Sequence, residues 1–145
     1  MHRAKDWLDQ AYADLSAAKD SKKTAHYEWT CFQAQQAAKK ALKSILLYFN
    51  VDSWGHSLVH LLRQLQQEVK TARVHFPNLQ QALTPQLLEQ AQELDRHYIQ
   101  PRYPNGFVSG YPAEYYNPTI AQKCVEYAES FIELAQRVFK ELSSS

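Results

Sequence analysis

The sequence predicts an all-α protein, an up-and-down bundle of about five helices that forms a single domain over residues 1–145. Apolar residues recur every three or four positions along most of the chain, and no stretch alternates apolar and polar residues as a strand does. Four prolines and two glycines fall between positions 101 and 118, so helix is interrupted there and free to form elsewhere. A chain of this length buries enough surface to fold without a metal or a disulfide.

The first half of the chain predicts two long helices. The first covers residues 3–20, and the second covers residues 25–50 with Thr24 as its expected N-cap. Each presents one apolar face, and many of the residues on both faces are small, which lets neighbouring helices approach closely. The face of the first helix consists of Ala4, Leu8, Ala11, Leu15 and Ala18, and that of the second of Tyr27, Cys31, Ala34, Ala38, Ala41, Ile45 and Phe49.

The third and fourth helices are recognised by their first residues. Ser57 is a good N-cap for a helix whose apolar face runs through residues 58–69. Thr84 followed by Pro85 opens the fourth helix, because a proline at the first helical position loses no hydrogen bond. Pro101 is the expected stop of this helix, since the residue before a proline is driven out of helical geometry.

The fifth helix has the widest apolar surface of the five. Asn117 and Pro118 open it by the same logic, and it is expected to reach about residue 142. Two adjacent apolar stripes cover about half of its circumference, which is more than one neighbour needs. Either this helix is central in the bundle, or it also faces a second subunit.

A long loop precedes the fifth helix. The segment "YPNGFVSGYPAEYYNP" spans about 16 residues and contains four tyrosines and a phenylalanine. Disordered segments are poor in aromatic residues, so this loop is expected to fold back onto the bundle and to form one wall of a pocket.

Charge and apolar content exclude several classes of function. The chain has 16 basic and 15 acidic residues and a net charge of +1, which gives no overall attraction to nucleic acid or to a membrane surface. The first residues lack the apolar core of a signal peptide, and no apolar run is long enough to span a membrane. Cys31 and Cys124 fall on apolar helix faces, so free thiols and a cytoplasmic location are expected.

The second helix carries the first chemical candidates. Gln36, Lys39, Lys40 and Lys43 share one arc opposite its apolar face, and lysines so arranged can hold a phosphate or form a solvated surface. His56 and His60 have the spacing of a metal-binding pair, but no further ligand accompanies them. We therefore expect no metal site, and no nucleophile with an activating base is visible, so no catalytic residue is predicted.

The stretch "LDRHYIQPRYP" carries the second group of candidates. Arg96 is expected to point away from the core, and Arg102 and Tyr103 stand on the first turn after Pro101. Arg102 can grip a phosphate while Tyr103 stacks on a base. The alternative for Arg102 is a structural contact with the last carbonyl groups of the helix.

The blocks "GHSLVHLL" and "LDRHYIQPRYP", following the long second helix, resemble the HEPN domain, named for higher eukaryotes and prokaryotes nucleotide-binding. The resemblance extends from about residue 3 to 142 and is strongest for the subgroup that contains the C-terminal domain of sacsin. It implies a helical bundle, commonly dimeric, that binds a nucleotide such as ATP or GTP and acts beside a minimal nucleotidyltransferase. Read position by position, the family's recurrent residues correspond to Lys40, His56, Ser57, Arg102, Tyr103 and Pro104.

Many HEPN proteins are metal-independent RNA-cleaving toxins whose motif is an arginine, four to six residues, and a histidine. The last histidine here is His97, so neither Arg96 nor Arg102 can begin that motif. The first expectation is therefore a non-catalytic nucleotide-binding module without a cofactor, and RNA is not an expected partner. The alternatives are a module for dimerisation or adaptor contacts, and an RNase toxin. The expected nucleotide-binding residues are Lys40, Lys43, His56, Arg96, Arg102 and Tyr103.

Overall fold

The structure, a computed structural model, describes residues 2–71 and 79–143, and in these ranges every regular element is a helix. The predicted all-α bundle is therefore confirmed. Five longer helices carry the fold, and two helices of four residues and one 3₁₀ turn, η1 (Pro104–Gly106), lie between them. The helices are α1 (His2–Lys23), α2 (Tyr27–Tyr48), α3 (Leu58–Lys70), α4 (Leu79–Ala82), α5 (Pro85–Asp95), α6 (Pro112–Tyr115) and α7 (Pro118–Ser143).

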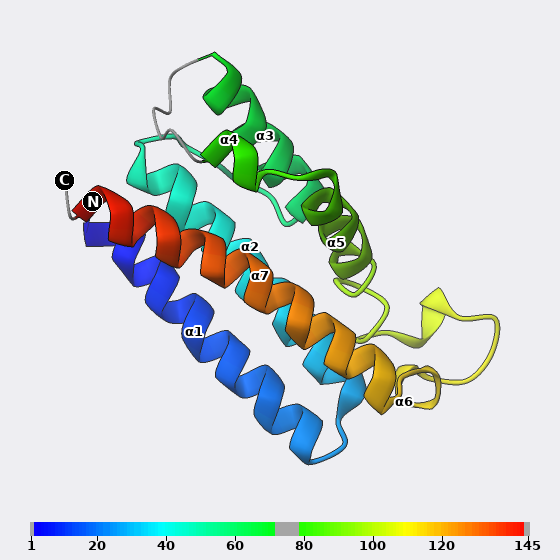
Figure 1. Cartoon of the computed structure of the whole chain (residues 1–145). Coiled ribbons are helices and arrows are strands. Elements are labelled where there is room, and N and C mark those ends of the chain that lie inside the picture. Colours follow the sequence, from blue (N-terminus) through cyan, green and yellow to red (C-terminus); the bar gives the residue numbers. More distant parts are fainter. Residues whose placement is uncertain (1, 72–78, 144–145) are drawn as a thin grey trace.

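The longer helices form two layers (Figure 1). The helices α1, α2 and α7 lie side by side and pack against one another. The helices α3 and α5 form the second layer, in which both contact α2 and α5 also contacts α7. Because α2 belongs to the first layer and also contacts the second, its side chains can meet residues from the loop before α3 and from the turn after α5.

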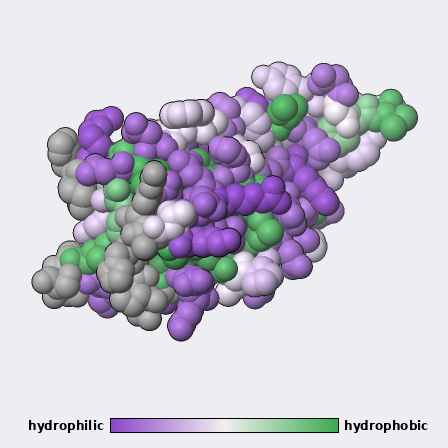
Figure 2. Space-filling model, turned by 90° about the horizontal axis from the view of Figure 1, so that it is seen from above, coloured by the Kyte–Doolittle hydropathy of each residue, from purple (hydrophilic) through white to green (hydrophobic). Residues whose placement is uncertain are grey.

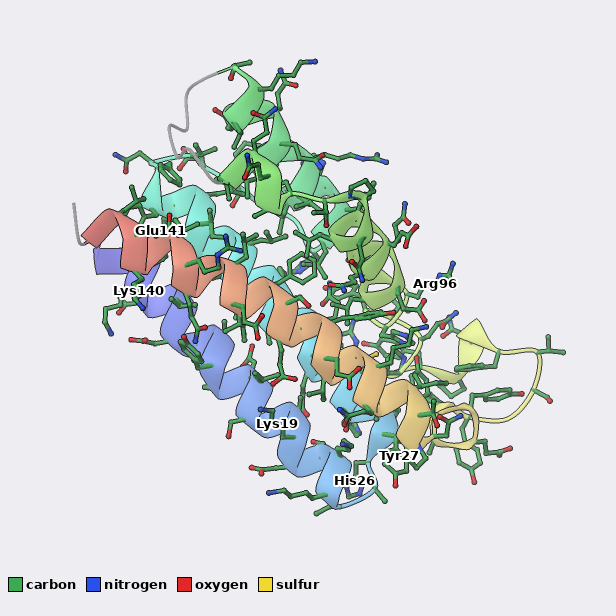
Figure 3. All side chains as sticks on the ribbon, viewed as in Figure 1. Lys19, His26, Tyr27, Arg96, Lys140 and Glu141 are labelled. Carbon is green, nitrogen blue, oxygen red and sulfur yellow. The ribbon has the colours of Figure 1, made fainter. Side chains whose placement is uncertain are left out.

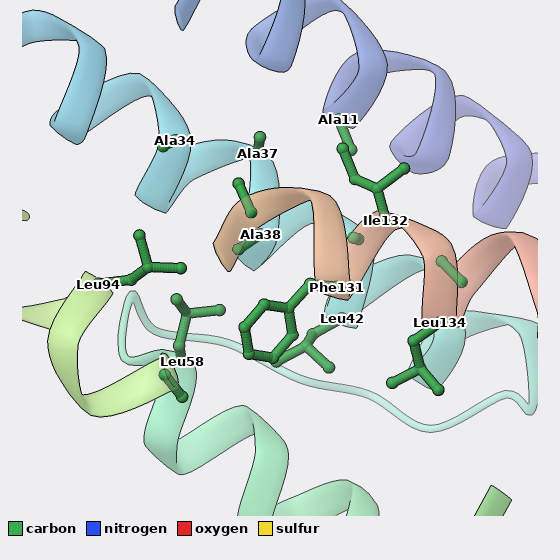
Figure 4. Close-up of a cluster of buried hydrophobic side chains, with 14 of the residues drawn as sticks. Ala11, Ala34, Ala37, Ala38, Leu42, Leu58, Leu94, Phe131, Ile132 and Leu134 are labelled. Atoms are coloured by element: carbon green, nitrogen blue, oxygen red, sulfur yellow. The ribbon is translucent and has the colours of Figure 1, made fainter. Parts of the chain in front are cut away.

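The core is continuous between the layers. Figure 4 shows Phe131 of α7 in one cluster of buried side chains with Leu42 of α2, Leu58 of α3 and Leu94 of α5. All four side chains are fully buried. Burying one such side chain contributes about 1.5–3 kcal/mol, so this cluster holds the second layer on the first.

Both apolar stripes of α7 are used inside the chain. Three residues from each stripe are fully buried: Cys124, Phe131 and Val138 from one, and Ala121, Ala128 and Ala135 from the other. The helix α7 contacts α1, α2 and α5. It is therefore central in the bundle together with α2, and both stripes contribute residues to the core of the chain itself.

Three of the predicted helix starts are confirmed. The side chains of Ser57, Thr84 and Asn117 each accept a hydrogen bond from the backbone N–H three residues further on, at 2.9–3.2 Å. These bonds satisfy donors that the first helical turn leaves without a partner.

The expected cap at Thr24 is wrong. Its hydroxyl donates to the carbonyl oxygens of Asp20 (3.1 Å) and Ser21 (3.2 Å), so Thr24 belongs to the end of α1. Ala25 then adopts a left-handed conformation with φ of 63°, and α2 begins at Tyr27.

The helix α5 ends earlier than Pro101 predicts. Its last residue is Asp95, and the next three backbone N–H groups bond to carbonyl oxygens only three residues back. Tight turns therefore occupy residues 96–102, and they direct His97 into the core, where it is 7% exposed.

The loop before α7 returns to the bundle in part. Tyr116 is buried and α6 packs on α2, as expected for a loop that folds back. Its middle part projects from the end of the molecule (Figure 1), where Val108 is fully exposed and Tyr111 is 56% exposed. Figure 2 shows apolar surface gathered at this projecting end. No helix in the two described ranges combines the length and apolar character needed to cross a membrane.

Candidate functional site

The carboxylate of Asp95, at the end of α5, binds the N-terminus of α3. Its Oδ1 accepts from the backbone N–H of Leu58 (2.8 Å), and its Oδ2 accepts from the N–H of Val59 (3.0 Å) and the hydroxyl of Ser57 (3.0 Å). Gln35 of α2 also donates to Oδ1, at 3.3 Å. An anion at a helix N-terminus satisfies free donors and interacts favourably with the helix dipole, so this carboxylate joins three helices.

A chain of polar side chains leads from this carboxylate along α2. Gln35 donates to the carbonyl oxygen of His56, and Gln36 donates to Oε1 of Gln35, both at 2.8 Å. The Nζ of Lys39 donates to Oε1 of Gln36 (2.8 Å) and lies 3.3 Å from Nδ1 of His56. Lys39 is only 6% exposed, so its ammonium group is held between the layers.

Arg102 lies against aromatic rings beside this chain. Its guanidinium carbon is 4.5 Å from the ring centroid of Phe32, 4.7 Å from that of Tyr98 and 5.2 Å from that of Tyr103. Its Nε donates to the carbonyl oxygen of Tyr98 at 2.9 Å. The ring of His56 stacks on Tyr98 with centroids 4.8 Å apart. We call Lys39, His56 and Arg102, with these three aromatic residues, the basic cluster.

The charges of the basic cluster repel one another. Burial, together with the charges of Lys43 and Lys40, lowers the pKa of Lys39 to about 8. Desolvation, followed by the charges of Lys39, Lys43 and Arg102, lowers the pKa of His56. In the part of the chain that the structure describes, no carboxylate forms an ion pair with Lys39, His56 or Arg102. An anion placed here would relieve the repulsion and favour the protonated forms.

The structure brings together three of the residues expected to bind nucleotide, and a fourth lies beside them. His56, Arg102 and Tyr103 belong to the basic cluster. Lys43 is one turn from Lys39, and its Nζ lies 5.3 Å from the ring centroid of Trp7 in α1. Burial lowers the pKa of Lys43 as well.

The other two expected residues lie elsewhere. The Nζ of Lys40 is 2.5 Å from Oδ2 of Asp14 in α1, so its charge is compensated there and Lys40 is not part of the basic cluster. Arg96 pairs with Glu93 at 3.3 Å, its side chain is 73% exposed, and it points into solvent at the end of α5 (Figure 3). Both are engaged by carboxylates outside the basic cluster.

Sequence reasoning did not assign Lys39, Phe32 or Tyr98 to the site. Lys39 was on the predicted arc, and its distance of one turn from Lys43 was the available signal. Tyr98 was expected to point into the core, and it does so only in part, because the tight turns after Asp95 rotate it toward His56. For Phe32 the sequence offered no signal, since it lies beside the apolar stripe of α2.

The basic cluster reaches the surface at His56 and Tyr103, which are exposed. A hollow of about 300 Å³ between α5 and α7, with Thr84, Gln90, Glu133 and Arg137 in its lining, shares no residue with it. Potential metal ligands also gather elsewhere. Within the described residues, one group of three occurs, formed by Cys31, His97 and Cys124 in the core.

The two thiols of this group lie close enough to affect each other's ionisation. The interaction with Cys124, together with burial, raises the pKa of Cys31. The interactions with Cys31 and with His97 lower the pKa of Cys124. Both cysteines are free thiols, as the sequence predicts.

The fold and the sequence place the chain in a known family. The HEPN domain family matches residues 4–138, so the chain belongs to the HEPN domain family. The chain is 28% identical over 140 residues to a protein of Methanocaldococcus jannaschii named "Putative toxin MJ1304", and the match covers 95% of this chain and 89% of that protein.

Solved structures agree with this assignment. TT1696 from Thermus thermophilus superposes with a TM-score of 0.83 at 34% identity, covering 95% of this chain and 99% of that one. ST0689, an archaeal HEPN homologue, gives a TM-score of 0.71 at 32% identity, covering 94% and 97%. An HEPN domain protein from Thermotoga maritima gives 0.68 at 29% identity, covering 93% and 98%.

Proposed function

We propose that this HEPN protein binds the phosphate groups of a nucleotide of the ATP or GTP class at the basic cluster, without catalysing a reaction. The observation that carries the proposal is the meeting of Lys39, His56 and Arg102, drawn from three separate segments, with no carboxylate paired to them in the described residues. Uncompensated positive groups beside aromatic rings suit a ligand that has both phosphate and base.

Each part of the cluster has a role in this proposal. Arg102 contacts phosphate oxygens through its terminal nitrogens, because its Nε is occupied by the carbonyl group of Tyr98. Lys39 and Lys43 add charge. Tyr103 is 50% exposed and offers a ring face to base or ribose.

The test compares two arginines that lie close together in the sequence, before and after Pro101. Arg102→Ala should weaken ATP binding by about 10- to 100-fold in calorimetry, the loss expected for a charge-assisted hydrogen bond. Arg96→Ala is the matched control and should leave the affinity unchanged, since Arg96 is exposed and paired with Glu93. Arg102→Lys separates charge from the stacking contact. The proposal fails if the wild-type protein gives no heat with ATP or GTP at millimolar concentration, or if both alanine variants behave alike.

A second candidate function is that of a toxin, favoured by the name of the archaeal relative. In this chain His97 is 7% exposed and bonded to Tyr116, so RNA cannot reach it without local opening. Purified protein would be incubated with structured and unstructured RNA in the presence of chelator. Cleavage that persists in His97→Ala would assign RNase activity to other residues.

The proposed partners are a second copy of the chain and a minimal nucleotidyltransferase. The projecting loop supports this part of the proposal, because Val108 and Tyr111 are exposed at its tip. Sedimentation at high concentration tests the homodimer, and a shift to monomer in Val108→Asp would assign the contact to the loop.

A further inference from the structure

Three side chains that are good metal ligands, none of them part of the basic cluster, meet in the core. Cys31 comes from α2, Cys124 from α7, and His97 from the tight turns after α5. The two cysteines are fully buried and His97 is 7% exposed. One ligand atom of each lies within 4.8 Å of the other two.

His97 is oriented toward this group by a hydrogen bond on its opposite side. Its Nδ1 lies 2.8 Å from the hydroxyl of Tyr116. Its Nε2 is buried and has no hydrogen-bond partner of acceptable geometry in the described part of the chain. A buried polar nitrogen without a partner is unfavourable, and Nε2 is the nitrogen left to face the two sulfurs. Histidines that bind metals typically have their second ring nitrogen held in this way.

We propose that Cys31, His97 and Cys124 form a binding site for a thiophilic divalent cation, with Zn²⁺ as the ion that fits the ligand set. Two sulfurs and one imidazole nitrogen are ligands that zinc prefers. The set leaves one coordination position open, as in zinc sites with three protein ligands. Tyr116 is a positioning residue, since it contacts His97 and not the ion.

The geometry requires little movement. In a tetrahedral zinc site with Zn–S of about 2.3 Å and Zn–N of about 2.0–2.1 Å, the ligand atoms are about 3.5–3.8 Å apart. Contraction by about 1 Å from the observed upper limit of 4.8 Å therefore suffices, and side-chain rotation can provide it. Binding displaces the proton of each thiol to solvent, because both sulfurs coordinate as thiolates.

The site would link three elements near the basic cluster. Cys31 precedes Phe32, and His97 precedes Tyr98, and both aromatic residues contact Arg102. The proposal does not depend on nucleotide binding, and its test uses no nucleotide.

The test is a metal titration of the full chain, reduced and stripped with chelator. Co²⁺ is the spectroscopic probe, and one equivalent per chain should give a sulfur-to-cobalt charge-transfer band that Zn²⁺ abolishes. Cys31→Ala and Cys124→Ala should each lose the band and weaken Zn²⁺ binding at least 100-fold. Tyr116→Phe should retain the band and weaken binding by about 10- to 100-fold, the loss typical for a residue that positions a ligand.

His60→Gln is the matched control, because His60 is exposed and lies outside the cluster, so its affinity should equal that of wild type. Circular dichroism verifies that each variant is folded, and Tyr116→Phe keeps the test informative if a cysteine variant unfolds. Absence of the band in the folded wild type overturns the proposal. So does a band of equal strength in Cys124→Ala. Formation of an internal disulfide under mild oxidant without any Co²⁺ uptake would assign the pair to redox chemistry and would also overturn it.

Discussion

Lys39 and Lys40 are neighbours in the sequence, but the fold gives their ammonium groups different partners. Lys40 reaches Asp14 of α1, and Lys39 reaches His56 in the loop before α3. Sequence spacing alone assigned both to one phosphate-binding arc. A step of one residue rotates a helical side chain by about 100°, so the partner on each side decides which lysine keeps an uncompensated charge.

The lowered pKa of Lys39 predicts how nucleotide binding depends on pH. Bound phosphate favours the charged lysine and raises its pKa above about 8, so binding takes up protons near this pH. The contribution of Lys39 to affinity should be constant below pH 8 and fall as pH rises further, by at most about tenfold per unit for one coupled proton. Calorimetry at pH 8.5 in two buffers of different ionisation enthalpy measures the uptake. Lys39→Met should bind more weakly at pH 7 and show no uptake; an unchanged uptake in this variant would contradict the role of Lys39.

At the scale of elements, local signals predicted helix starts well and helix ends less well. Ser57, Thr84 and Asn117 bond to N–H groups three residues away, so short sequence patterns are enough to recognise them. The connection between α1 and α2 depends instead on a left-handed residue, and Ala25 gives no local indication of it. The end of α5 depends on a distant partner, since Asp95 is used by α3.

Ala25 is a site where glycine should stabilise the protein. A non-glycine residue at φ of 63° costs about 1–2 kcal/mol, and glycine avoids this cost. The greater conformational freedom of glycine in the unfolded chain offsets about 0.4–1 kcal/mol of that gain. Ala25→Gly should therefore raise the free energy of unfolding by about 0.5–1 kcal/mol, which thermal or urea unfolding can measure. Ala13→Gly, at an exposed position within α1, is the control of opposite sign and should lose about 1 kcal/mol. Destabilisation by both would show that the turn has no strain to release.

At the scale of the whole molecule, the sequence predicted which helix faces are buried better than which helices pack against one another. The apolar stripes predicted which faces of α1, α2 and α7 are buried, because that requires only helical periodicity. The two stripes of α7 left open whether a neighbouring helix or a second subunit covers them, and the structure shows α1, α2 and α5 packed on this helix. The basic cluster could be predicted only in part, since His56, Arg102 and Lys39 meet through the loop before α3 and the turns after α5.

Asp95 joins the two layers where α5 ends and α3 begins, and its removal should weaken the whole fold. Its carboxylate satisfies two N–H groups at the start of α3 and bonds to Ser57 and Gln35, so Asp95→Ala leaves these donors without their partner. We expect a loss of about 2–3 kcal/mol in the free energy of unfolding, near the upper end for hydrogen bonds to a charged group. Asp95→Asn retains one acceptor and should lose less.

Asp9→Ala serves as the control for Asp95→Ala, because the Asp9 carboxylate forms an exposed ion pair with Lys5 on α1. It should change stability by less than about 0.5 kcal/mol. Urea unfolding at pH 7 measures both variants, and hydrogen exchange locates the loss. Because Asp95 holds the start of α3 against α2, protection should fall first at Leu58 and Val59 and then in the rest of α3, while α1 stays protected. Equal stability of Asp95→Ala and Asp9→Ala would show that packing around Leu58 and Leu94 alone holds the second layer in place.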